Sequence, residues 1–135
     1  MIDSKYKYSD ITEKIIGCSF NVHKQLGNGF PEVIYHRCLE IEFNKSGLKY
    51  KTESGVPIYY DNIEVGKRRA DFVVEDNVLL EIKAMQTIED ICVSQTLNYL
   101  KAFNLEVGLL VNFGEKSLKV KRFINTLKQE TVKSV

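Results

Sequence analysis

The spacing of apolar residues changes near residue 48 from a helical period to an extended one. Apolar side chains recur every three or four residues before that point, which is typical of helices with one buried face. Beyond it they alternate with polar residues, as in short strands, and one further helical stretch interrupts the strands. The expected helices are Asp10–Leu26, one from Pro31 that stops at Gly47, and one from Thr87 to about Phe103. The expected strands are Leu48–Glu53, Val56–Tyr60, Ile63–Val74, Val78–Ala84, Glu106–Phe113 and Leu118–Phe123.

Local signals refine several of these boundaries. Asp10 with Glu13 predicts a capping box at the start of the first helix. Thr87 has the character of an N-cap for the third helix, and Gly66 predicts a bulge within the long third strand. In the second helix, the inward face is expected to comprise Ile34, Cys38, Leu39 and Ile41.

The predicted order ααββββαββ indicates an α/β (α+β) fold. Strand, helix and strand over 78–113 imply a parallel crossover, and hence a mixed central sheet flanked by helices. A chain of 135 residues fits one domain. We expect a single domain over 1–135 with a core at 10–124, and loose tails at 1–8 and 126–135. A short helix or frayed tail is expected after the last strand.

Composition limits how the chain can meet nucleic acid. The formal net charge is only +1, so any such contact must be local. Two basic stretches are candidates: Lys67, Arg68 and Arg69 in one, and Lys116, Lys119, Lys121 and Arg122 in the other. From composition alone, solvated strand edges are the plainer interpretation of both stretches.

Cysteine usage and hydropathy favour a cytoplasmic protein. Cys18, Cys38 and Cys92 are odd in number and far apart, which predicts buried reduced thiols rather than disulfides or a zinc site. The chain starts without a signal-peptide pattern. Its apolar runs of about five residues are far shorter than the roughly 20 that a membrane helix needs. His23 and His36 lack partners at ligand spacing and are expected at surface or half-buried positions.

Three charged residues interrupt strands that are otherwise apolar: Asp71, Glu81 and Lys83. Charged groups in such positions are costly unless they are paired or bind a metal. Because side chains alternate along a strand, Glu81 and Lys83 share one face.

The length of the turn between the two strands decides whether Asp71 joins that face. A three-residue loop at 75–77, with Asn77 left-handed, would place Val74 opposite Val78 and Asp71 opposite Glu81. A two-residue turn would direct Asp71 to the other side. We expect the three-residue loop.

Two opposed carboxylates repel each other unless a cation lies between them. Oxygen ligands without His or Cys suit Mg²⁺ or Mn²⁺ better than zinc. Lys83 would then position or deprotonate the nucleophile, or stabilise the charged phosphate. The alternative is a structural ion pair in which Lys83 neutralises Asp71 and Glu81.

Three further polar residues are weaker candidates for the catalytic site. Gln95 and Tyr99 lie four apart on one face of the third helix, where Gln95 could orient a water or phosphate or simply satisfy backbone groups. Glu32 stands in a first helical turn, where the helix dipole alone favours it.

These residues resemble a known pattern. Asp71 followed by Glu81-Ile82-Lys83 resembles the D…(D/E)xK core of the PD-(D/E)xK nuclease superfamily. The run from Gln95 to Tyr99 resembles the Q-x-x-x-Y element of its exonuclease branch. Similarity to the GxxExxY family of predicted nucleases is carried by Gly29-Phe30-Pro31-Glu32-Val33-Ile34-Tyr35, Leu110-Val111-Asn112-Phe113-Gly114 and Lys121-Arg122-Phe123.

The resemblance implies a restriction-endonuclease-like fold and a Mg²⁺ (or Mn²⁺) cofactor. Asp71, Glu81 and Glu32 would be metal ligands, and Lys83 the catalytic lysine. Gln95 and Tyr99 would support the catalytic site. Ala70 stands where the superfamily pattern has proline, at a position that is not a ligand.

The expected function is that of a metal-dependent nuclease that hydrolyses DNA phosphodiester bonds. The alternative is a non-catalytic nucleic-acid- or protein-binding module that retains the nuclease fold, and a third reading is an enzyme acting on RNA or a small phosphoester. Expected partners are DNA, or else RNA, and a second copy or another protein, with no membrane. The expected nucleic-acid contacts are Lys67, Arg68, Arg69, Lys121 and Arg122.

Overall fold

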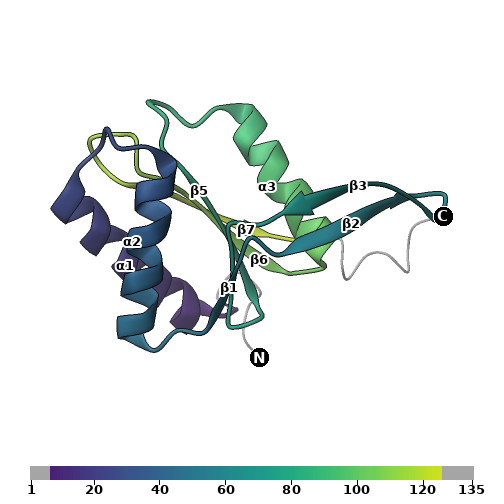
Figure 1. Ribbon diagram of the computed structural model, residues 1–135, viewed down its shortest axis with the longest axis horizontal. Helices are drawn as coiled ribbons and strands as arrows, with labels where there is room; N and C mark the ends of the chain where they lie inside the picture. Colours follow the sequence, from purple (N-terminus) through teal and green to yellow (C-terminus); the bar gives the residue numbers. More distant parts are fainter. Residues whose placement is uncertain (1–6, 126–135) are drawn as a thin grey trace.

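A five-stranded mixed sheet separates two helical layers in the computed structural model, which describes residues 7–125 (Figure 1). The helices are α1 (Ser9–Leu26), α2 (Glu32–Ser46) and α3 (Asp90–Phe103). The strands are β1 (Tyr50–Thr52), β2 (Gly55–Tyr60), β3 (Ile63–Arg69), β4 (Phe72–Val74), β5 (Val78–Lys83), β6 (Val107–Asn112) and β7 (Lys119–Ile124). Helices α1 and α2 cover one face of the sheet, and α3 covers the other (Figure 1).

The sheet has the strand order β1-β4-β5-β6-β7. Strands β5 and β6 are parallel and joined through α3, while the other neighbours are antiparallel. The predicted mixed sheet with one crossover is therefore confirmed. Strands β2 and β3 form a separate hairpin that projects from the body of the molecule (Figure 1).

Strand β5 divides its side chains between the two helical layers. Leu80 and Ile82 are fully buried in the core beneath α1 and α2. Leu79 is buried in a smaller core with Leu100 of α3. Since side chains alternate along a strand, Glu81 lies on the α3 side of the sheet together with Leu79.

The predicted turn length between β4 and β5 is confirmed. Val74 lies opposite Val78, and the Asn77 N–H donates to the Val74 carbonyl at 3.0 Å. The predicted left-handed Asn77 is wrong, because the positive φ angles fall on Glu75 (52°) and Asp76 (59°). Two consecutive left-handed residues closed in this way are typical of a type I′ turn.

The predicted strand Ile63–Val74 is divided into β3 and β4 by Ala70 and Asp71. Strand β3 pairs only with β2, whereas β4 lies between β1 and β5. A register shift adjoins Gly66, where β3 has one residue more than β2, so the predicted bulge is confirmed. The division at Ala70 frees Asp71 from the regular ladder.

The predicted inward face of α2 is wrong at Ile41, which is 60% exposed. The fully buried row is instead Tyr35, Leu39 and Phe43. Tyr35 stacks on Phe113 with ring centroids 4.6 Å apart. Aromatic contacts with distant strands therefore set the rotation of the helix.

Two predicted helix starts are also wrong. Helix α1 begins at Ser9 behind a left-handed Tyr8 that makes no side-chain cap, so Asp10 lies inside the first turn. Helix α3 begins at Asp90 with Glu89 as its N-cap, three residues after Thr87. In both helices an acidic residue stands in the first turn, where the helix dipole favours it.

All three cysteines are free, and their burial agrees with expectation at Cys18 and Cys92 but not at Cys38. Cys18 and Cys92 are buried, and Cys38 is half-buried. His23 is more buried than expected, and its Nε2 lies 2.9 Å from the Glu115 carbonyl oxygen. None of the described helices has the length and apolar character needed to span a bilayer.

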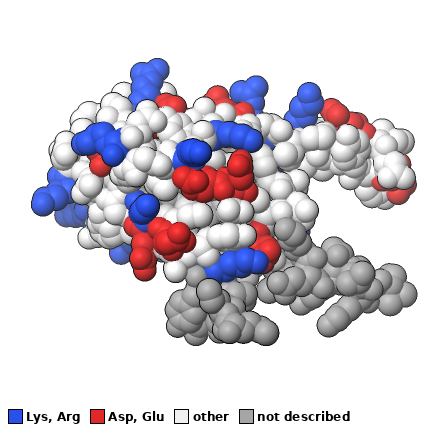
Figure 2. All heavy atoms as spheres, turned by 90° about the horizontal axis from the view of Figure 1, so that it is seen from below, with Lys and Arg blue, Asp and Glu red and all other residues white. Residues whose placement is uncertain are grey.

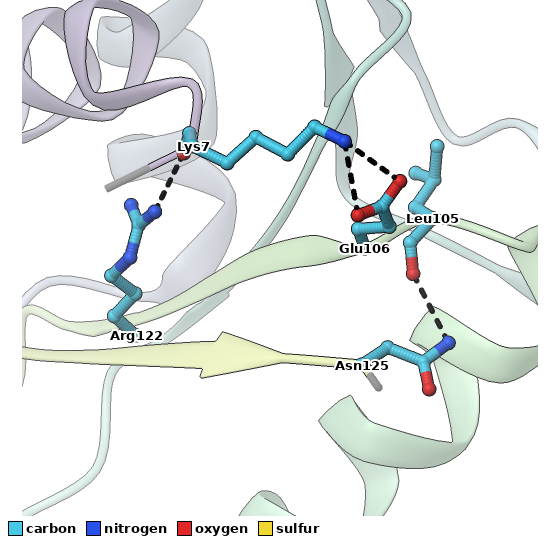
Figure 3. A network of polar contacts seen from close by, with 5 residues as sticks. All are labelled: Lys7, Leu105, Glu106, Arg122 and Asn125. Atoms are coloured by element: carbon cyan, nitrogen blue, oxygen red, sulfur yellow. Dashed lines mark hydrogen bonds and ion pairs between the residues drawn. The ribbon is translucent and has the colours of Figure 1, made fainter. Parts of the chain in front are cut away.

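Lys7 belongs to the predicted loose tail but is anchored to the sheet (Figure 3). Its Nζ lies 3.1 Å from both carboxylate oxygens of Glu106, and its carbonyl accepts from Arg122 Nη2 at 2.6 Å. Arg122 Nη1 also donates to Thr12 Oγ1 at 3.0 Å. Apart from Lys7 and Tyr8, the predicted tails, including the segment expected after the last strand, lie outside the described residues.

Candidate active site

Hydrogen bonds run in both directions between Asp71, just before β4, and the Glu81–Ile82 segment of β5. The Asp71 N–H donates to Glu81 Oε1 at 3.1 Å. The Ile82 N–H, next to Glu81, donates to Asp71 Oδ2 at 2.8 Å. Since Phe72 opposes Leu80, Asp71 follows opposite Glu81, as the turn length predicted.

Glu81 is buried, at 5% exposure, and Asp71 is half-buried. Burial raises the pKa of Glu81 to about 9, and the neighbouring Asp71 carboxylate contributes further to the rise. The Asp71 N–H and the Lys83 ammonium oppose this shift but do not cancel it. The pair therefore retains a proton near neutral pH unless a cation is supplied.

Lys83 ends β5 on the same face as Glu81. Its positive charge opposes the rise in the pKa of both Glu81 and Glu32, so the ammonium interacts electrostatically with both carboxyl groups. Its carbonyl accepts from the Phe113 N–H at 2.8 Å, which fixes the end of the strand. Within residues 7–125 the ammonium makes no direct ion pair.

Glu32 approaches the same site from the first turn of α2. Its side chain is solvent-exposed at the rim, yet its pKa is raised, first by desolvation and then by Asp71. Lys83 and His36 act in the opposite direction. Glu32, Asp71 and Lys83 thus interact electrostatically although they come from three separate elements.

The donor set suits a hard divalent cation only in part. No group of three or more His, Cys, Asp or Glu side chains within residues 7–125 is arranged to hold a metal ion. Asp71 and Glu81 offer two carboxyl groups whose charges are unfavourable side by side. A bound cation would relieve that repulsion, and carboxylate oxygens are the ligands that Mg²⁺ prefers. Glu32 stands farther out than these two.

Gln95 and Tyr99 are half-buried on α3. Tyr99 packs against the smaller core that contains Ala70, Val73 and Leu79, on the α3 side of the sheet. Neither side chain makes a hydrogen bond with another described residue. Both residues therefore lie on the helix that covers the Glu81 face, without direct polar contact to the carboxyl pair.

His36 is a neighbour of the site that sequence reasoning missed. Its Nε2 lies 3.3 Å from the Asp71 carbonyl oxygen, and its ring stacks on Phe72 at 4.3 Å. Its Nδ1 lies 3.7 Å from Glu40 Oε2. The available signal was its position four residues after Glu32, on the same face of α2.

Asn112 is a second residue that sequence reasoning did not assign to the site. Its fully buried amide donates to the Met85 carbonyl and to Glu115 Oε2, both at 2.9 Å. Its Oδ1 accepts from the Met85 N–H at 2.9 Å and the Gly114 N–H at 3.1 Å. Asn112 therefore clamps the chain two residues beyond Lys83. A buried Asn at the end of an apolar strand was the available signal.

Gly114 permits this close approach of two loops. A Cβ on Gly114 would lie 2.3 Å from the backbone N and O of Met85. No side chain fits at that distance, so glycine is required for the segment after Lys83 to meet the turn after β6.

Strand alternation separates the basic residues of β3. Arg68 lies beside Asn98 and Lys101 of α3. Lys67 and Arg69 lie on the opposite face of the hairpin, where Arg69 Nη1 is 3.7 Å from Glu53 Oε2.

The basic residues of β7 are divided in the same way. Lys121 is exposed and in register with Leu110, which is in register with Glu81, so Lys121 shares the Glu81 face. Arg122 faces α1, where its guanidinium donates to Thr12 Oγ1 and to the Lys7 carbonyl, so it is engaged within the chain. On the face drawn in Figure 2, acidic and basic side chains are interspersed and form no continuous basic area.

Comparison with known proteins identifies the family. The chain matches the family model described as PD-(D/E)XK nuclease superfamily over residues 9–123. The crystal structure of SSO0001 superposes with a TM-score of 0.56 at 21% sequence identity, covering 96% of this chain and 68% of that one. No curated protein matches the chain. The match over residues 9–123 spans the three helices, all of the candidate site residues and the sheet except its last residue, and the chain belongs to the PD-(D/E)XK nuclease superfamily.

Proposed function

We propose that this chain is a metal-dependent nuclease that hydrolyses DNA phosphodiester bonds at Asp71, Glu81 and Lys83. The observation that carries the proposal is the pair of hydrogen bonds from Asp71 N–H to Glu81 and from Ile82 N–H to Asp71. They hold two carboxyl groups together at a position where their charges repel, which is costly unless the site binds a cation. Membership of a nuclease superfamily supports phosphodiester hydrolysis as the reaction class.

Asp71 and Glu81 would hold a divalent cation, Mg²⁺ or Mn²⁺, with Glu32 contributing from the rim. When bound, such a cation neutralises charge on the phosphate and lowers the pKa of a coordinated water. The Lys83 ammonium would hold the attacking water or the charged phosphate in place. We assign Gln95 and Tyr99 a supporting role on α3.

We also assign the chain to the GxxExxY group, because the turn before α2 gives each residue of that motif a physical role. Gly29 adopts a φ of 111°, which disfavours other residues. The Tyr35 hydroxyl donates to the Gly27 carbonyl at 2.6 Å and accepts from the Phe30 N–H at 3.2 Å. The tyrosine thereby fixes the turn that presents Glu32 towards Asp71.

Cleavage of labelled DNA tests this function. Single-stranded, duplex and branched DNA, with RNA as a comparison, would be incubated with the full chain in Mg²⁺, Mn²⁺ or EDTA. We expect cleavage of DNA in either metal and none in EDTA. Asp71→Asn and Lys83→Ala should each lower the rate at least 100-fold, while thermal melting shows an intact fold.

Three outcomes would contradict the proposal in different ways. Cleavage that both variants retain would remove Asp71 and Lys83 from the mechanism. Binding of nucleic acid without turnover, in every metal, would favour a non-catalytic module. Unfolding of Asp71→Asn and Lys83→Ala alike would indicate that the charges form a structural ion pair.

A further inference from the structure

The β2–β3 hairpin projects beside α3 (Figure 1). A groove lies between these two elements. Its volume is about 410 Å³. The side chains that give it chemical character are Tyr59, Arg68, Asn98 and Lys101. Pro57, Ile58 and Ala102 complete its walls.

The charge of this groove differs from that of the chain as a whole. Arg68 and Lys101 reach it from two separate elements, and none of its lining residues is acidic. On the opposite face of the same hairpin, Lys67 and Arg69 are accompanied by Glu53 and Glu64. Positive charge is therefore concentrated on the α3 side of the hairpin, although the chain carries a net charge of only +1.

The groove also offers an aromatic surface. Tyr59 lines it and is 61% exposed, so the residue is largely open to solvent. An exposed ring beside two cations suits a polyanion that carries flat apolar groups. An unpaired nucleotide has both features, because its base can stack on the ring while its phosphate meets Arg or Lys.

The groove and the candidate active site are lined by neighbouring residues of the same two segments of the chain. Arg68 stands near the end of β3, three residues before Asp71. On the other wall, Asn98 precedes Tyr99 on α3 and follows Gln95 by one turn. A strand bound in the groove would therefore lie against two segments, 68–71 and α3, that also carry residues assigned to the site.

From these observations we infer that the groove binds single-stranded nucleic acid and guides it to Asp71 and Glu81. Tyr59 stacks on a base, Arg68 and Lys101 contact the backbone phosphates, and Asn98 hydrogen-bonds along the strand. This inference rests on the proposed nuclease function and adds the form of the substrate. A paired duplex keeps its bases stacked inside and offers no such face to Tyr59.

Anisotropy of a labelled 15-residue oligothymidylate, measured on the full chain in EDTA, tests binding without cleavage. Tyr59→Ala should weaken binding by between about 5-fold and 100-fold. Arg68→Ala and Lys101→Ala should each weaken it and reduce the slope of log K against log salt by about 0.7. The matched controls are Tyr60→Ala, at 71% exposure outside the groove lining, and Lys14→Ala, exposed on α1 on the other side of the sheet, and neither should change the affinity.

The outcomes separate this inference from the proposed function. Equal losses of affinity in the groove and control variants, or no binding by the parent, would overturn the inference about the groove. The cleavage assay would still decide the proposed nuclease function separately. Asp71→Asn should lose cleavage and keep the oligonucleotide affinity. If the parent sediments as a dimer and Tyr59→Ala as a monomer with unchanged affinity for the oligonucleotide, the groove binds a second copy of the chain. That result would overturn the inference. Tighter binding of blunt duplex than of oligothymidylate would overturn the assignment to single strands.

Discussion

The N–H of Asp71 donates to the carboxyl group of Glu81 at 3.1 Å, and this bond holds two acids together across neighbouring strands. Burial of Glu81, together with the nearby Asp71 charge, raises the pKa of Glu81 to about 9. In the folded chain without a bound cation, Glu81 therefore holds a proton near neutral pH, and this proton relieves the repulsion between the two carboxyl groups. This relationship leads to predictions about stability as well as activity.

Glu81→Gln should make the fold more resistant to denaturation in EDTA at neutral and alkaline pH. The folded-state pKa is raised above its usual 4.5, so the contribution of the protonated Glu81 is fully present below pH 4.5. It is lost as the pH rises towards about 9, by up to about 1.4 kcal/mol per pH unit. Glutamine does not titrate, so the advantage of Glu81→Gln should grow across that interval.

Guanidinium unfolding at pH 4.5, 7 and 9 measures this effect. Glu64→Gln, on the exposed hairpin, is the matched control and should behave like the parent at every pH. A constant difference between Glu81→Gln and the parent over the whole range would show that Glu81 does not carry the raised pKa.

Mg²⁺ should raise the melting temperature of the parent, and more so at pH 8.5 than at pH 6. The two carboxyl groups must lose their shared proton to bind a cation, so affinity increases with pH. A concentration 100 times Kd would stabilise the fold by about 2.7 kcal/mol. Asp71→Asn should abolish the increase, whereas Asp76→Asn, in the exposed turn before β5, should retain it. A pH-independent increase in all three chains would indicate binding elsewhere.

Asn112→Asp should lower both stability and activity, because aspartate cannot donate to Met85 or Glu115. The unsatisfied partners should cost about 1–3 kcal/mol. Loss of the clamp beyond Lys83 should lower kcat at least tenfold with little change in KM. Guanidinium unfolding and DNA cleavage measure the two effects.

Asn125→Asp provides the matched control for that prediction. Asn125 is also buried, and its amide donates to the Leu105 carbonyl at 3.1 Å, at the opposite end of the sheet from Lys83 (Figure 3). It should lose comparable stability but keep its kcat. Equal loss of kcat in both variants would indicate that Asn112 has only a general structural role.

Tyr35→Phe should weaken the turn that leads into α2. The lost hydroxyl leaves the Phe30 N–H and the Gly27 carbonyl without their partner, at a cost of about 1–3 kcal/mol. Tyr50→Phe removes only a 3.5 Å bond to the Glu40 carbonyl and should have a smaller effect. Chemical unfolding checks the order, and equal losses would argue against a special role for the Tyr35 hydroxyl.

The sequence was sufficient to predict the relation between Asp71 and Glu81 because it depends on local rules. Alternation along β5 and the length of one turn determine which residues oppose each other. The position of the left-handed residue in that turn was predicted wrongly because the residue just before β1 also forms hydrogen bonds with the turn. The Lys49 N–H donates to Glu75 Oε2 and its carbonyl accepts the Glu75 N–H, both at 2.8 Å, so the turn is also shaped by β1.

Interactions between distant segments could not be predicted in the same way. Apolar residues cover more than one side of α2, so periodicity alone could not choose between Ile41 and Phe43. The choice depends on Phe72, whose ring lies edge-on to Phe43 at 5.2 Å. His36 likewise meets the Asp71 carbonyl only after α2 has packed against the sheet.

Anomalous diffraction from crystals of the Lys83→Ala chain soaked in Mn²⁺ tests the central claim most directly, because it locates the cation without turnover. We predict a peak within coordination distance of carboxylate oxygens from both Asp71 and Glu81, and its absence from Asp71→Asn crystals treated identically. Absence of any peak at this pair in well-occupied crystals above pH 8, or a peak only elsewhere on the chain, would contradict the account.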